Sequence, residues 1–235
     1  MENRPFSPEV IFSSIPALLP YLWVTLEVGL ISILTGSVVG MLLAWAKLSS
    51  LSWLRKLANG YTYIIRCTPS IVLLFIVFYG LPKWMEYAFD IDIDDLSRAV
   101  FVIITFTLLF GAYVSEVFRS AYQAIPKGQY EAAVTVGLSS FQAVLRIMIP
   151  QAAVVALPNF GNSVINLLKE SALAYTIGLI DLLGRTNLII AKNYGGYGIE
   201  LYTACLLIYW ALSIVIERVF MQCEIHLSHQ KKVSG

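Results

Sequence analysis

The sequence predicts an all-α integral membrane protein with five transmembrane helices, and three observations lead to this fold class. First, 58% of the 235 residues are hydrophobic and 13% are charged, against about 25% charged residues in a typical soluble domain. Second, the mean hydropathy of the whole chain is +0.74. Third, apolar stretches of the length that a bilayer crossing requires recur along the chain. The net charge of +1 offers no broad basic surface for nucleic acid.

Each predicted span is a mostly apolar stretch, because a helix needs about 20 such residues to cross the hydrocarbon layer. The five predicted spans are Tyr21–Lys47, Ala58–Leu81, Ala99–Arg119, Gln151–Leu168 and Leu201–Ile216. Pro158 and Gly161 are expected to interrupt the fourth span. Interrupted backbone at membrane depth needs a cavity or protein neighbours to satisfy its polar groups.

The distribution of lysine and arginine predicts the orientation of these spans, since cytoplasmic loops carry an excess of both. Ten of these residues fall on one side of the five-span topology and six on the other. This difference places residues 1–20 outside the cell as an N-terminal segment, and the membrane domain at 21–218. The tail 219–235 lies in the cytoplasm. The connection 181–197 is then outside, where a short interfacial helix with turns is expected.

One segment between apolar stretches, 123–150, has the pattern of two short helices joined by a turn, and the topology places it in the cytoplasm. Pro126 suits the first turn of a helix, where its missing N–H costs nothing. Gly137 can end this first helix in the left-handed conformation that glycine adopts cheaply. Ser139 then caps the second helix, and Gln142 three residues later completes a capping box.

The two helices of this segment offer a small-residue surface to another molecule. Ala132, Ala133 and Gly137 have little or no side chain, so a second surface can approach the backbone closely, and Glu131 adds a charge beside them. Pro150 is expected to end or kink the second helix. The pattern favours docking on a soluble partner as much as packing against the protein's own helices.

Several motifs in the same order resemble those of ABC importer permeases. Glu131-Ala132-Ala133, three residues, Gly137, nine residues and Ile147–Pro150 resemble the family's cytoplasmic E-A-A-x3-G-x9-I-x-L-P loop, with Ile149 in place of the usual leucine. Arg66–Pro69 resembles R-G-T-P, with cysteine at the glycine position. Matches to the branch for histidine, glutamine, arginine, opines and cystine are Tyr113–Arg119, Gly128-Gln129, Pro150–Ala152, Leu157-Pro158 with Asn162, and Leu168–Ser171.

This resemblance extends over residues 25–217 and implies the fold of an ABC transporter type-1 transmembrane domain. It implies a permease subunit, in a bacterial cell membrane, of an ATP-driven importer for a polar amino acid of the cystine, basic or glutamine class. The implied partners are a cytoplasmic ABC ATPase, a second permease chain that is identical or paralogous, an extracytoplasmic amino acid-binding protein and membrane lipid. Glu131, Ala132, Ala133 and Gly137 are the implied ATPase-coupling residues.

No cofactor is expected on the chain itself, and the resemblance puts ATP and magnesium on the partner ATPase. The sequence has no G-x-x-x-x-G-K-[ST] phosphate-binding loop. It also lacks G-x-S-x-G, H-E-x-x-H and Cys-x-x-Cys, so an enzyme is not expected. No metal site is expected: His226 and His229 lie in a polar tail, and Cys67, Cys205 and Cys223 are expected to be free, buried thiols.

Acidic residues within spans are candidates for the substrate path. A charge at the membrane centre costs about 2.5 kcal/mol or more, so Glu27 should face protein or water. It neutralises a cationic group of the substrate, makes a structural hydrogen bond to a neighbouring helix, or lies near the outer interface. Glu116 is a second candidate, and it also stands three residues before Arg119, a spacing at which the two side chains can form an ion pair on one helix.

Three further substrate-path candidates lie in or after the fourth span. Asn162 and Ser163 follow the expected interruption, where exposed backbone and amide groups suit the carboxylate and ammonium of an amino acid. Lys169 either attracts a carboxylate or anchors the outer end of the span. Two other classes of function remain open at this point, namely a self-contained channel or ion-coupled amino acid carrier, and a membrane scaffold without transport.

Overall fold

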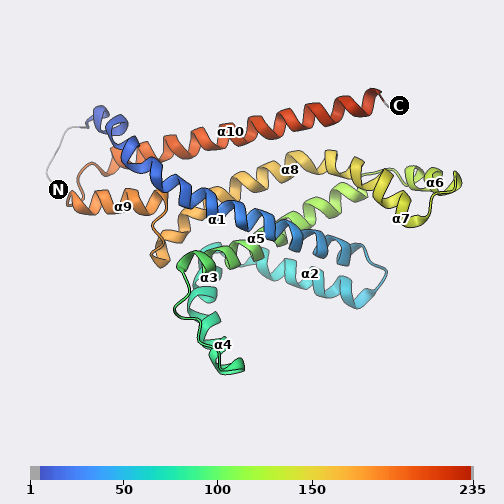
Figure 1. Ribbon diagram of the computed structural model, residues 1–235, viewed down its shortest axis with the longest axis horizontal. Coiled ribbons are helices and arrows are strands. Elements are labelled where there is room, and N and C mark those ends of the chain that lie inside the picture. Colours follow the sequence, from blue (N-terminus) through green and yellow to red (C-terminus); the bar gives the residue numbers. More distant parts are fainter. Residues whose placement is uncertain (1–5, 234–235) are drawn as a thin grey trace. The chain divides into compact units, whose positions relative to one another are not determined.

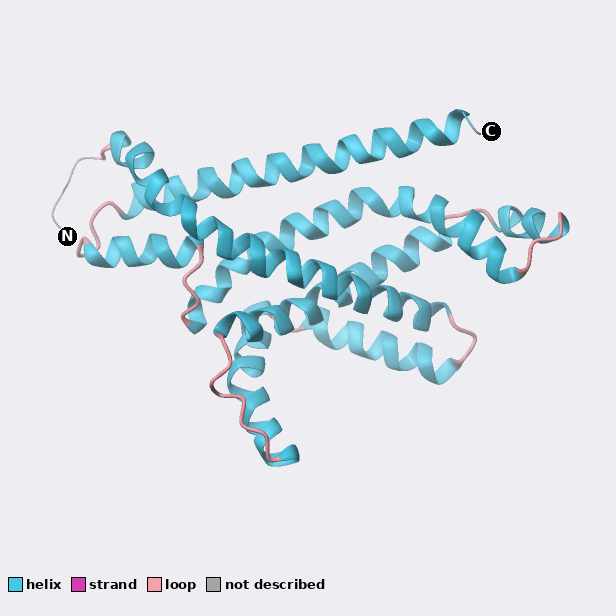
Figure 2. Ribbon diagram, viewed as in Figure 1, coloured by secondary structure: helices cyan, strands magenta, loops and turns pink. Residues whose placement is uncertain are grey.

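The computed structural model describes residues 6–233, and every regular element in this range is a helix (Figure 1, Figure 2). The described chain divides into two units, the first comprising 6–33, 68–106 and 166–215 and the second 34–67, 107–165 and 216–233. Four helices contribute residues to both units: α1 (Pro8–Leu48), α5 (Arg98–Gln123), α8 (Ile149–Glu170) and α10 (Gly198–Val233).

Five helical runs are long and apolar enough to cross a membrane, which confirms the predicted fold class. These runs are Pro8–Leu48, Ser70–Phe89, Arg98–Gln123, Ser140–Ile177 and Gly198–Leu227. The third predicted span lies wholly within α5, and the fifth lies within α10. The helix α10 continues through Val233, far beyond the predicted end at Ile216.

The first span starts earlier than predicted, at Pro8 instead of Tyr21. Pro16 and Pro20 lie inside α1 without ending it. Proline is tolerated within membrane-crossing helices because neighbouring groups satisfy the backbone that it leaves unpaired. Residues 8–20, expected to precede the membrane domain, are therefore part of its first helix.

The second predicted span, Ala58–Leu81, is wrong as a single helix. The residue before a proline is sterically disfavoured in the α conformation, and the helix α2 (Ser52–Cys67) ends just before Thr68 and Pro69. Three elements follow this break: α3 (Ser70–Phe75), a π-helical turn (Ile76–Gly80) and α4 (Leu81–Phe89). The apolar run that can cross a membrane is thus Ser70–Phe89.

The fourth span is continuous, so the interruption expected at Pro158 and Gly161 is wrong. The helix α8 includes both residues, and Gly161 instead has a packing role. A Cβ atom added there would lie 2.8 Å from Cγ of Phe220 in α10. The missing side chain leaves room for the Phe220 ring, whose centroid lies 6.0 Å from that of Phe160.

Pro150 does not end the helical run either. A π-helical turn, Val144–Met148, joins α7 (Ser140–Ala143) directly to α8. In a regular helix the proline ring clashes with the carbonyl four residues earlier, which belongs here to Arg146. Arg146 lies within the wider π-helical turn, so its carbonyl is not in regular helical geometry and the chain stays helical through Pro150.

The core of the first unit forms where α9 (Leu182–Lys192) packs on residues of α1 and α10. Its buried side chains are Ile11, Leu18, Leu182, Ala204, Cys205 and Ile208. A 3-10 helix, Ser171–Ile177, ends at Gly178, which has the left-handed conformation (φ 83°). The carbonyl oxygen of Gly178 accepts a 2.9 Å hydrogen bond from Arg98. The helix expected in the connection 181–197 is therefore present as α9.

In the second unit, α1 and α5 cross at glycines. Gly36 and Gly40 lie four residues apart on α1. A Cβ atom at Gly40 would lie 2.4 Å from Cγ2 of Val114 and 3.2 Å from the carbonyl oxygen of Gly111. Small residues at this spacing allow two membrane helices to approach closely. This crossing fixes α5 against α1 and thereby positions the charged residues described next.

Candidate functional site

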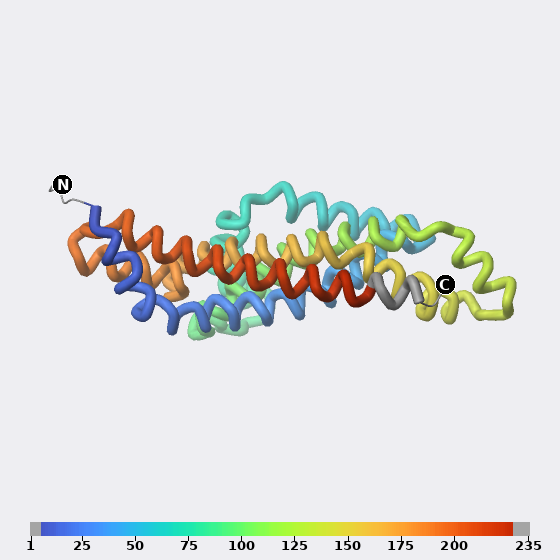
Figure 3. Tube along the Cα trace, turned by 90° about the horizontal axis from the view of Figure 1, so that it is seen from above, coloured from blue at the N-terminus to red at the C-terminus, as the bar shows by residue number. Residues whose placement is uncertain are grey.

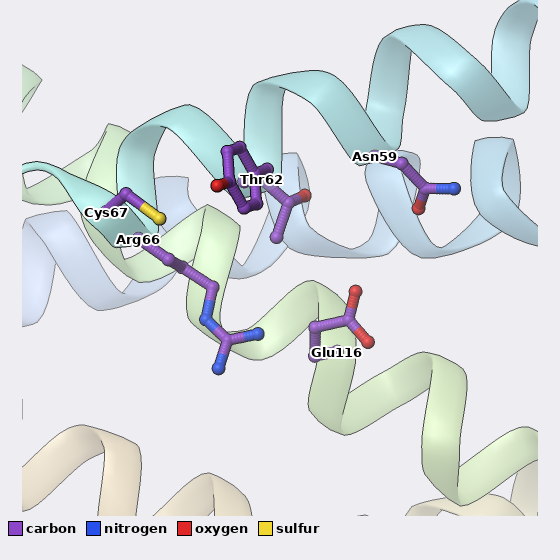
Figure 4. Close-up of a pocket in the computed structure, with 6 residues that line it drawn as sticks. Asn59, Thr62, Arg66, Cys67 and Glu116 are labelled. Atoms are coloured by element: carbon purple, nitrogen blue, oxygen red, sulfur yellow. The ribbon is translucent and has the colours of Figure 1, made fainter.

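The second unit contains a polar pocket of about 360 Å³ between α2 and α5 (Figure 4). Its lining residues are Asn59, Thr62, Tyr63, Arg66, Cys67 and Glu116. On α2, positions 59, 62, 63 and 66 follow the i, i+3, i+4, i+7 spacing that places side chains on one helix face. The helix therefore presents one polar face to the pocket, and Glu116 is contributed by α5.

The carboxylate of Glu116 is held by two cations. Its Oε1 atom lies 2.7 Å from Nζ of Lys47, and its Oε2 atom lies 2.7 Å from Nη2 and 2.8 Å from Nε of Arg119. The predicted pair of Glu116 and Arg119 is thus confirmed, while the contact with Lys47 was not foreseen. Lys47 also donates a 2.8 Å hydrogen bond to the hydroxyl of Ser115, and its side chain is only 1% exposed.

Arg66 extends from α2 toward α5, the helix that carries Glu116 (Figure 4). Its Cζ atom lies 5.7 Å from the ring centroid of Tyr113, a cation–π distance. Among the residues whose side chains are described, 6–227, this guanidinium has no hydrogen bond or ion pair partner. Arg66 therefore brings to the pocket a cation whose hydrogen-bond donors are available to a ligand.

The segment between α5 and α8 forms the expected pair of short helices, α6 (Lys127–Thr135) and α7, and the chain turns back between them (Figure 3). Gly137 has φ 93°, and the Ser139 hydroxyl and the Gln142 side chain form the predicted capping box. Pro126 precedes the first helical residue as its N-cap instead of lying in its first turn.

The helix α6 is anchored through Tyr130, which packs on apolar side chains from the segments that flank α6 and α7. Ile125, Met148 and Ala152 form a small core with Tyr122 and Tyr130. This anchoring holds the turn between α6 and α7 in place while much of its surface stays accessible.

The candidate coupling residues differ in exposure. Ala133 is 6% exposed, so its small side chain serves packing within the chain. Glu131, Ala132 and Gly137 are exposed. Two large apolar side chains, Val136 and Phe141, are 80% and 74% exposed beside the turn.

Of the five candidate substrate-path residues, only Glu116 lines the polar pocket. Glu27 and Lys169 belong to the first unit, and both are exposed. Asn162 and Ser163 belong to the second unit on the uninterrupted helix α8. The argument from exposed backbone therefore does not apply to these two residues. The Ser163 hydroxyl donates to the carbonyl of Asn159 at 2.9 Å, a bond within its own helix.

The cysteines differ in burial from what their sequence surroundings predict. Among the three cysteines, all free, Cys205 is buried as expected, whereas Cys67 and Cys223 are exposed. The expectation of buried thiols is thus wrong for these two, since Cys67 ends α2 at the pocket and Cys223 follows the predicted end of the last span. The side chain of His229 lies outside the described residues.

The carboxylate of Asp181 lies in the first unit and is buried, with 1% of the residue exposed. It caps α9 by accepting a 2.8 Å hydrogen bond from the N–H of Gly184, and its other oxygen accepts a 3.4 Å bond from the Tyr209 hydroxyl. Burial raises the pKa of Asp181 to about 6, although these hydrogen bonds favour the charged form.

Comparison with known proteins relates this architecture to transport systems. A family model described as "Binding-protein-dependent transport system inner membrane component" matches residues 36–221. The chain is 36% identical over 222 residues to the L-cystine transport system permease protein TcyL of Bacillus subtilis (strain 168), covering 94% of this chain and 92% of the relative. It is 34% identical over 218 residues to the nopaline transport system permease protein NocM of Agrobacterium fabrum, covering 92% and 90%.

Solved structures agree with this relation. A crystal structure described as an amino acid ABC transporter with histidines superposes with a TM-score of 0.82 at 27% sequence identity, covering 95% of this chain and 100% of that chain. An inward-facing structure of the MetNI methionine ABC transporter superposes with a TM-score of 0.70 at 18% identity, covering 94% and 99%. This second likeness concerns the fold alone.

Proposed function

The chain belongs to the family of binding-protein-dependent transport system inner membrane components, and from this membership we propose that it forms the translocation path of an ATP-driven importer for a polar amino acid. The relatives named as cystine and nopaline permeases support an amino acid substrate. Five membrane-crossing helices support a path through the bilayer. The chain is thus the transport subunit of a larger complex.

The observation that carries this proposal is the anchored turn between α6 and α7. Gly137 ends α6 in a left-handed conformation, and the exposed side chains of Val136 and Phe141 flank it. Large exposed apolar residues next to small ones suit a protein interface. We assign this surface, with Glu131, Ala132 and the buried support of Ala133, to docking of an ABC ATPase.

The remaining parts of the complex follow from the family. ATP and magnesium bind to the ATPase chains, whose closure moves the docked turn and thereby the helix α8 that continues from it. A second permease chain, identical or paralogous, completes the path, and an extracytoplasmic binding protein delivers the amino acid. The N-terminus faces outward and the C-terminus faces the cytoplasm of the bacterial cell, as the lysine and arginine distribution favours.

Two matched glycine substitutions test the coupling role. A Cβ atom at either Gly137 or Gly128 meets nothing within 4 Å, but only Gly137 has a positive φ. Alanine in the left-handed conformation costs about 1–2 kcal/mol, so Gly137→Ala should displace the turn. We expect at least a fivefold loss of ATP-dependent amino acid uptake in proteoliposomes and weaker co-purification of the ATPase.

Gly128→Ala is the control, because it adds the same methyl group to ordinary helical backbone of α6. It should leave uptake and co-purification unchanged. Equal uptake by the wild type and Gly137→Ala would contradict the coupling role. Uptake by this chain alone, without any ATPase, would instead establish a self-contained channel or ion-coupled carrier.

A further inference from the structure

We propose that the pocket between α2 and α5 selects substrates that carry a carboxylate and no net positive charge, and that Arg66 binds this carboxylate. The proposal rests on the proposed function and names the substrate class of the same transport path. It concerns one unit of the chain, since all six residues lining the pocket belong to the second unit. The volume of about 360 Å³ lies at the small end of the range for ligand pockets, which suits a single amino acid.

The charged side chains at the pocket carry a net positive charge. Three cations, Lys47, Arg66 and Arg119, surround the single carboxylate of Glu116 or line the pocket beside it. Together the three cations and the carboxylate carry three positive charges and one negative charge, a net charge of +2. A cationic side chain entering this pocket would meet repulsion, whereas a carboxylate would meet attraction.

Both oxygens of Glu116 already bind cations of the protein itself. Lys47 occupies Oε1 and Arg119 occupies Oε2 through two of its nitrogens. A substrate ammonium would have to share this carboxylate with two cations that already neutralise its charge, and the nearly fully buried Lys47 would repel it. The carboxylate thus neutralises protein cations, and the position of Glu116 in the pocket does not make it a receptor for basic amino acids.

The guanidinium of Arg66 contacts the Tyr113 ring, and among the residues whose side chains are described it is without a hydrogen bond or an ion pair. An arginine fork matches the two oxygens of a carboxylate, and bonds of this kind are about twice as strong as neutral ones. Stacking on Tyr113 limits the number of conformations of the side chain, so less freedom is lost when a ligand binds.

The test is equilibrium binding of radiolabelled L-glutamine, L-glutamate, L-cystine and L-arginine to the purified complex of this chain with its ATPase. The wild type should bind one or more of the first three, and L-arginine at least tenfold more weakly. Arg66→Gln should weaken the preferred ligand about ten- to a hundredfold, the range for hydrogen bonds to charged groups. Arg66→Lys keeps the charge but loses the fork, so its affinity should lie between the two.

The matched control is Arg55→Gln, the same change on the same helix at a residue that does not line the pocket. It should bind like the wild type, and co-purification of the ATPase with each variant shows that the complex is folded. The proposal is overturned if L-arginine binds as tightly as the others, or if Arg66→Gln leaves the affinity of a bound ligand unchanged. If wild-type cells take up no amino acid of the panel, the proposed function itself is wrong.

Discussion

Two carboxylates of this chain, Glu116 and Asp181, are satisfied in opposite ways. Glu116 in the second unit is bound by two cations and remains 27% exposed at a polar pocket. Asp181 in the first unit is 1% exposed, and its partners are a backbone N–H and a hydroxyl. Within the described residues no cation lies at ion-pair distance from Asp181.

This difference indicates that Glu116 belongs to a charged pocket, whereas Asp181 serves as the structural N-cap of a helix. A carboxylate among several cations keeps its charge and leaves a positive excess that a ligand can use. A carboxylate among neutral donors is held for what it does to the backbone, here the start of α9, and its charged form carries the cost of burial. Burial alone therefore does not identify a functional carboxylate in a membrane protein. The groups that contact the carboxylate distinguish a functional role from a structural one.

The largest effect should come from removing the acid of the charged site. Glu116→Ala leaves the buried cation of Lys47 with only the Ser115 hydroxyl as a partner. Breaking a buried ion pair by removing one partner costs about 3 kcal/mol or more. Chemical unfolding of the purified protein in detergent should show this loss of unfolding free energy.

The double variant Lys47→Met/Glu116→Ala provides the control, because it removes the uncompensated cation as well. It should regain most of the loss, as expected when both partners of a buried pair are replaced by apolar groups. If the double variant is less stable than Glu116→Ala alone, the two charges do not act as a pair.

Removal of the cap should have a smaller effect. Asp181→Ala takes away the acceptor for the Gly184 N–H at the start of α9. Replacing an N-cap aspartate by alanine costs about 1–2 kcal/mol. Asp181→Asn keeps an oxygen acceptor without the charge, so it should be at least as stable as the wild type at pH 7. The same unfolding assay distinguishes the two, and equal losses in both variants would contradict the capping role.

The smallest effect is the dependence of stability on pH. The pKa of Asp181 is about 6 in the folded chain and about 3.9 in an unfolded one. Between these values the folded state binds more protons, so the unfolding free energy rises as the pH falls. This contribution is fully present below about pH 4 and is lost as the pH rises through 6.

Lowering the pH from 7.5 to 5 should therefore stabilise the wild type by about 1 kcal/mol relative to Asp181→Asn. Thermal unfolding of both proteins at the two pH values measures this difference. An identical pH response of the wild type and Asp181→Asn would show that another group titrates in this range.

Features set by neighbouring residues could be predicted from the sequence. The capping box of Ser139 and Gln142, the left-handed Gly137, and the pair of Glu116 and Arg119 all span four residues or fewer, and all three are confirmed. The fold class was equally accessible, because apolar length is a property of each stretch by itself.

Features set by contacts between distant segments could not be predicted. The bond between Lys47 and Glu116 joins residues 69 positions apart, and nothing near either residue indicates the other. The expected break at Pro158 and Gly161 is absent, and the residue for which Gly161 leaves room, Phe220, is also distant in sequence. The crossing of α1 and α5 does have a local signal in the sequence, the four-residue spacing of Gly36 and Gly40. A prediction of the membrane spans from apolar length does not use this spacing.

The π-helical turn at Val144–Met148 has a consequence for how this chain can change in length. Each residue of a helix turns the chain by about 100° about the axis, and the wide turn holds one residue more than a regular turn. Deleting one residue there would leave a regular turn, so α6 and α7 would keep nearly the same angle about the axis against α8. A one-residue deletion at this turn is thus compatible with the docking surface, whereas the same deletion in the regular part of α8 would rotate that surface by about 100°.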